Sequence, residues 1–137
     1  MNKLDLTMKI ILIYNDFLIN KLGTPKEFFT ETNKILNKSY EDKNLKVLES
    51  ALNDIKHQIK YMPLQNLVEL NKIFKSNFGS SIEVVKFELE NKINKILKRG
   101  SIVSDEEYRI ILEEKENFDF NNEKIEKINF MLTNYKS

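Results

Sequence analysis

The sequence predicts an all-α protein, a single-domain antiparallel bundle of about five to seven helices over residues 1–137. A chain of 137 residues has the usual length of one domain. Its three glycines and two prolines all fall where a helix is expected to begin or end. Apolar residues recur at spacings of three and four along most of the chain, which is the pattern of helices with one buried face.

The first helix is expected at residues 4–22, with a buried strand as the alternative. The run from Ile10 to Tyr14 is rich in β-branched residues, and periodicity alone does not separate the two structures. Apolar positions continue to Leu22, and no second segment alternates with period two to supply a partner strand. Because a helix here is apolar on most sides, we expect a central helix surrounded by the others.

The next three helices are expected at 25–39, 42–61 and 63–78. Thr24 precedes Pro25 and lies three residues before Glu27, the spacing of an N-cap and capping box. Pro63 lacks an amide hydrogen, which predicts a break between the last two of these helices. The clearest apolar stripe lies before this break and consists of Leu45, Leu48, Leu52, Ile55, Ile59 and Met62.

The last three helices are expected at 81–99, 105–117 and 122–135, so that a helical hairpin forms from about residue 101 to 137. Ser80 with Glu83 and Ser104 with Glu107 repeat the capping-box spacing. Gly23, Gly79 and Gly100 each follow an apolar-periodic segment, as residues in the left-handed conformation do after a helix.

Residue composition removes much catalytic chemistry. The chain has no cysteine and one histidine, His57, which helical phase places about 180 degrees from the buried stripe of its helix. The acidic residues from Asp105 to Glu107 suit the first turn of a helix, and no metal-ligand or phosphate-loop motif is present. We therefore expect no catalytic, cofactor-binding or metal-binding residue, and no enzyme.

Charge argues against strong nucleic-acid binding. The 22 basic and 21 acidic side chains give a net charge of +1, and only two of the basic residues are arginines. Lys92, Lys95 and Arg99 share one flank of their expected helix and form a basic ridge. We expect its main partner to be the acidic C-terminal segment of the same chain, with weak nucleic-acid association through the ridge as the alternative.

The C-terminal segment carries the best candidates for a protein-binding surface. Tyr108 and Arg109 follow the acidic first turn of their helix and belong to residue types enriched at binding hot spots. Phe118 and Phe120 lie in a polar connection, where partial exposure or core packing would each explain them. Protein binding and closure of the core both remain open for these two aromatic residues.

These observations favour a non-enzymatic protein-interaction domain, such as an adaptor, an inhibitor or a bacterial immunity-type protein, acting through a charged and apolar surface. The alternatives are the nucleic-acid-associated protein described above and an enzyme or small-ligand carrier without a visible motif. No apolar stretch approaches the ~20 residues that span a bilayer, so we expect a cytoplasmic protein with no membrane partner. The sequence leaves the identity of the protein partner, the oligomeric state and the binding of a small apolar ligand open.

Overall fold

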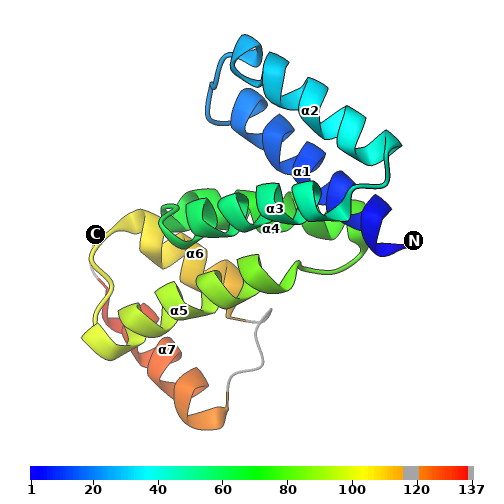
Figure 1. Cartoon of the computed structure of the whole chain (residues 1–137). Coiled ribbons are helices and arrows are strands. Elements are labelled where there is room, and N and C mark those ends of the chain that lie inside the picture. Colours follow the sequence, from blue (N-terminus) through cyan, green and yellow to red (C-terminus); the bar gives the residue numbers. More distant parts are fainter. Residues whose placement is uncertain (116–120, 136–137) are drawn as a thin grey trace. The chain divides into compact units, whose positions relative to one another are not determined.

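The computed structural model describes residues 1–115 and 121–135. Over these residues the protein is an all-α helical bundle, as predicted, with seven α-helices, one 3-10 helix and no strand (Figure 1). The first segment is a helix and not a strand. In chain order the elements are α1 Lys3–Asn20, η1 Lys26–Phe29, α2 Thr30–Glu41, α3 Leu45–Lys60, α4 Leu64–Phe78, α5 Glu83–Arg99, α6 Asp105–Glu114 and α7 Asn122–Asn134.

The chain forms two compact units that alternate along the sequence. The first unit contains Met1–Met62 and Ile73–Ser80, and the second contains Pro63–Lys72 and Ser81–Ser137. Helix α4 therefore supplies its N-terminal part to the second unit and its C-terminal part to the first. The expectation of a single domain stays a prediction, which a measurement of unfolding tests below.

In the first unit, α1 packs against α2 and α3 (Figure 1). Its core consists of buried apolar side chains from these helices, η1 and the end of α4: Met8, Ile11, Tyr14, Phe17, Phe29, Leu36, Leu48, Ile55, Ile59 and Phe74. The prediction of a central α1 is wrong, because Leu6 and Leu12 are 39% and 41% exposed on its outer side. An apolar composition all around a helix did not lead to burial all around it.

In the second unit, the core is built from the start of α4 and one face each of α5, α6 and α7. The buried side chains are Leu67, Val68, Leu70, Val85, Leu89, Ile93, Ile96, Leu97, Ile102, Ile110, Ile111, Ile128, Met131 and Leu132. Helix α7 contacts both α5 and α6. Helix α6 buries Ile110 and Ile111 but leaves Leu112 exposed, as expected of three consecutive apolar residues on a helix.

Most helix boundaries follow the sequence signals. Helix α3 ends at Lys60 and α4 begins at Leu64, so the break predicted at Pro63 is confirmed. Gly23, Gly79 and Gly100 all have positive φ angles, as predicted. Gly100 ends α5 at φ 82°, and its amide donates to the carbonyl oxygens of two residues in the last turn, Ile96 and Leu97.

The predicted N-caps differ in outcome. Ser104 caps α6 by accepting a hydrogen bond from the Glu107 amide at 3.1 Å, which confirms that prediction. Ser80 does not cap α5, because the chain stays extended at Ile82, which precedes the helix and makes no side-chain cap. The hydroxyl of the intervening Ser81 instead donates to the buried Asn71 Oδ1 at 2.7 Å.

The predicted cap at Thr24 is also wrong. Pro25 precedes a 3-10 helix over Lys26–Phe29, and this element has no side-chain cap. The α-helix that was expected from residue 25 begins only at Thr30. The first turn after Pro25 is the tighter 3-10 helix, whose hydrogen bonds span three residues instead of four, and the α-helix follows it.

Candidate functional site

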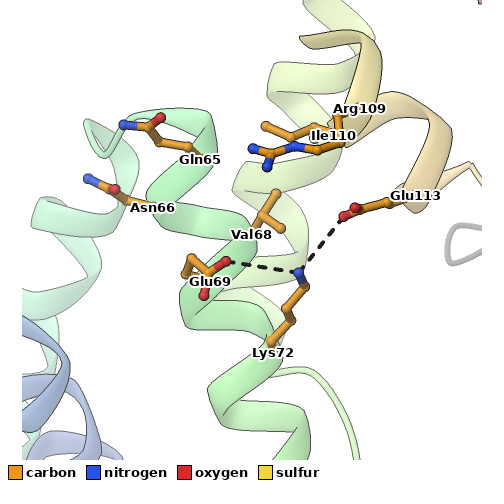
Figure 2. A pocket seen from close by; sticks show the side chains of 8 residues that line it. All are labelled: Gln65, Asn66, Val68, Glu69, Lys72, Arg109, Ile110 and Glu113. Atoms are coloured by element: carbon orange, nitrogen blue, oxygen red, sulfur yellow. Dashed lines mark ion pairs between the residues drawn. The ribbon is translucent and has the colours of Figure 1, made fainter. Parts of the chain in front are cut away.

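A groove of about 260 Å³ lies between α4 and α6 in the second unit (Figure 2). Its floor is apolar and consists of Val68 and Ile110, which are both buried. Its rim is polar and contains Gln65, Asn66, Glu69, Lys72, Arg109 and Glu113. The α4 residues share one face because they recur at helical spacing over two turns. We call this site the α4–α6 groove.

Lys72 links the two sides of the groove. Its Nζ lies 3.9 Å from Glu69 Oε1 on α4 and 3.8 Å from Glu113 Oε2 on α6, as the dashed lines in Figure 2 show. All three side chains are about half exposed, so each pair contributes little to stability, on the order of 0–1 kcal/mol. The pairs nevertheless occupy the only lysine of the rim.

A second contact between α4 and α6 lies near one end of the groove. The side-chain amide of Gln65 is oriented so that its nitrogen faces the carboxylate of Glu106. In this orientation the nitrogen donates to Glu106 Oε1 and Oε2 at 2.7 and 2.8 Å. Both carboxylate oxygens of Glu106 thereby accept a hydrogen bond from a neutral amide. The two contacts join the polar rim of α4 to both ends of α6, at Glu106 in its first turn and Glu113 in its last.

Arg109 extends its guanidinium from α6 toward α4, close to Val68 (Figure 2). The side chain is exposed. Within residues 1–115 and 121–135, Arg109 makes no ion pair and no side-chain hydrogen bond, in contrast to Lys72 beside it. Arg109 is thus the cation of the rim that is available to a binding partner.

The structure separates Tyr108 from Arg109, although the sequence grouped them. The Tyr108 ring stacks on Tyr135 with centroids 5.5 Å apart and an interplanar angle of 27°. The Tyr135 hydroxyl donates to Asp105 Oδ1 at 2.7 Å, and this hydrogen bond raises the pKa of Tyr135 to about 12. Tyr108 therefore contacts the end of α7, whereas Arg109 lines the α4–α6 groove.

The basic ridge is also divided. Arg99 donates from Nε and Nη2 to the Ser101 carbonyl oxygen at 3.0 and 2.9 Å and forms an ion pair with Glu107. Glu107 belongs to the acidic C-terminal segment, the partner that the sequence favoured for the ridge. Lys92 and Lys95 have no ion pair in the part of the chain that the structure describes. Binding of nucleic acid by the three residues stays a prediction.

The other sequence candidates contribute no further side chain to the groove. His57 is exposed on α3 of the first unit, as its helical phase predicted. Phe118 and Phe120 lie outside the described residues, so their proposed role in protein binding stays a prediction. Over the described ranges, no set of three acidic or histidine side chains could hold a metal ion, and no helix is long and apolar enough to cross a membrane.

Sequence reasoning found Arg109 but missed the α4 side of the groove. Gln65, Glu69 and Lys72 recur at spacings of four and three, so their common face was visible in the sequence. The pairing of that face with α6 was not visible, because it depends on how the helices pack. The i, i+4, i+7 spacing of these polar residues was the signal that could have suggested a common face.

No protein-family model matches the chain, and neither curated proteins nor solved structures give a match to it. We therefore infer a function from the contacts of the α4–α6 groove.

Proposed function

We propose that this protein is a non-enzymatic protein-interaction domain, of the adaptor, inhibitor or bacterial immunity type, and that it binds its partner at the α4–α6 groove. The observation that supports the proposal is the combination of an apolar floor with a charged rim on which Arg109 has no partner among the described residues. Arginines and apolar pockets of this kind are characteristic of binding hot spots.

The lining of the groove suits a protein partner. The groove has a volume of about 260 Å³. Such a volume accommodates one or two side chains of a partner. Its lining of amides, carboxylates, one lysine and one arginine suits hydrogen bonds and ion pairs across an interface.

Site-specific crosslinking tests this proposal, because the chain contains no cysteine and a single introduced thiol is unique. Asn66→Cys places a thiol-linked photo-crosslinker at the groove, and Thr32→Cys places the same reagent on the exposed face of α2 in the first unit. Neither of the replaced side chains makes a hydrogen bond within the described ranges. Both labelled proteins are irradiated in extracts of cells that express the natural protein.

We expect discrete crosslinked proteins from position 66 that are missing from position 32 and that unlabelled protein suppresses by competition. Far-UV circular dichroism must show that both variants keep the helical fold. Identical adducts from the two positions would show non-specific contact. Adducts at position 32 alone, or at neither position, would also contradict binding at the groove.

A further inference from the structure

We infer that the α4–α6 groove recognises a single carboxylate of a partner protein, presented beside an apolar side chain, and that Arg109 is the residue that binds this carboxylate. The inference rests on the proposed function, because it names the partner chemistry of the same groove. It is argued from the contacts around Arg109, the geometry of its guanidinium and the charge of the rim.

Arg109 has acidic neighbours on its own helix, and all of them have other partners. An arginine in a helix commonly pairs with acids three or four residues away. Helix α6 offers three such acids, Asp105, Glu106 and Glu113. Each has a different partner: Tyr135, Gln65 and Lys72 respectively. The fold therefore engages every nearby carboxylate of α6 and leaves the guanidinium of Arg109 without one.

The guanidinium of Arg109 has the geometry that binds a carboxylate. Its five N–H donors form a planar fork that matches the two oxygens of a carboxylate, and a bidentate pair is stronger and more directional than a single contact. The chain has only two arginines, and Arg99 is already bonded to Ser101 and Glu107. Arg109 is thus the one arginine whose fork is open to an external carboxylate.

The charge of the rim favours a single protein carboxylate over a nucleic acid. Three carboxylates, those of Glu69, Glu106 and Glu113, surround two cations, Lys72 and Arg109, so the immediate surroundings carry a net negative charge. Charges within about 10 Å are only partly screened at ordinary salt concentrations. A polyphosphate backbone brings many negative charges to this rim, so it is repelled more strongly than a single carboxylate that Arg109 binds directly.

The floor of the groove explains the apolar side chain beside the carboxylate. Val68 and Ile110 close the base of the groove beside the guanidinium and are only 4% and 2% exposed, so little water reaches the guanidinium through the base. Arg109 itself is exposed, so a neighbouring aliphatic or aromatic side chain of the partner would cover the open side of the ion pair and exclude water from it. Exclusion of water strengthens the ion pair, because it lowers the local dielectric constant.

The test uses the full chain and a library of random peptides displayed on phage. Enriched peptides are synthesised, and their affinities are measured for the natural sequence, Arg109→Gln, Arg109→Lys and the control Lys86→Gln. Lys86 is an exposed α5 lysine that lies outside the groove and makes no ion pair among the described residues. Circular dichroism establishes that each variant is folded before binding is measured.

We expect the enriched peptides to share an Asp or Glu next to an apolar residue. Arg109→Gln should weaken their binding at least tenfold, Arg109→Lys should weaken it less because charge remains without the fork, and Lys86→Gln should leave it unchanged. Replacement of the acidic residue in the peptide by its amide should have the same effect as Arg109→Gln. The two losses should not add, because they remove the same contact.

Several outcomes would overturn the inference. Enriched peptides that lack a carboxylate, that are rich in Lys or Arg, or that bind Arg109→Gln normally would show that Arg109 is not the recognising group. The same holds if no peptide is enriched. Binding of single-stranded RNA at physiological salt that Arg109→Gln abolishes would assign the groove to nucleic acid instead. If crosslinking at position 66 nevertheless succeeds, the interaction function stands and only the carboxylate specificity fails.

Discussion

Tyr14 illustrates how a single polar group is accommodated in the core of the first unit. The side chain is 1% exposed, and its hydroxyl donates to Gln58 Oε1 on α3 at 2.7 Å. Burial raises the pKa of Tyr14 from 10.0 to about 12. Since the pKa is higher in the folded state, the stability from this group is fully present below pH 10 and is lost as the pH rises from 10 toward 12.

Tyr14→Phe should therefore have two effects. At pH 7 the loss of the hydrogen bond should lower the free energy of unfolding by about 1 kcal/mol. Between pH 10 and 12 the variant should lose less stability than the natural sequence. In the natural sequence the Tyr14 hydroxyl ionises more readily in the unfolded chain, which favours unfolding, and phenylalanine has no such hydroxyl. Urea denaturation at several pH values measures both effects, with the exposed Tyr61→Phe as the matched control.

The same decline in stability above pH 10 in Tyr14→Phe and the natural sequence would contradict the assignment of the raised pKa to Tyr14. Tyr135 also has a raised pKa, but it is present in both proteins and cancels in the comparison.

At the level of single residues, the sequence predicted local conformations such as the positive φ of Gly100. It did not predict contacts such as Tyr14 to Gln58, which join residues 44 positions apart.

The start of α6 provides a prediction at the level of a secondary-structure element. Ser104→Ala removes the side chain that accepts from the Glu107 amide, so it should destabilise the protein by about 1 kcal/mol. Ser80→Ala is the matched control, because the sequence assigned Ser80 the same role but the structure places Ile82 at the N-cap of α5. Ser80→Ala should change the free energy of unfolding by less than ~0.5 kcal/mol.

Thermal or urea unfolding of the two variants measures this difference. Equal losses of stability in Ser80→Ala and Ser104→Ala would mean that the capping-box spacing alone decides the cap. The structure instead shows that tertiary contacts decide between competing signals. The hydrogen bond from Ser81 to Asn71 lies immediately before α5, and a sequence pattern contains no information about it.

The sequence predicted the number and type of helices better than their packing. Helical periodicity, proline and glycine are local signals, so the break at Pro63 and the end of α5 at Gly100 were predictable. The outward position of Leu12 and the pairing of α4 with α6 arise from packing between distant segments. For this reason the candidate site was only half predicted, by Arg109 on α6 without its α4 partners.

At the level of the whole molecule, the two compact units both take residues from α4. We expect a single cooperative thermal transition, because loss of either unit removes packing from part of this helix and helix formation is itself cooperative. Differential scanning calorimetry measures the outcome, and the calorimetric and van't Hoff enthalpies should agree. Two resolved transitions would show that the chain consists of two independently unfolding domains.

The alternation of the two units along the chain also limits which segments of the gene can be exchanged by recombination. A contiguous domain can move between genes as one uninterrupted block. Residues 1–62 would leave behind Phe78, whose ring lies 4.8 Å from Lys9 Nζ, together with the rest of the segment 73–80 that completes the first unit. Residues 63–137 would in turn carry that segment away from its unit. Gene recombination at one crossover that transfers one unit intact therefore removes a segment from the other unit.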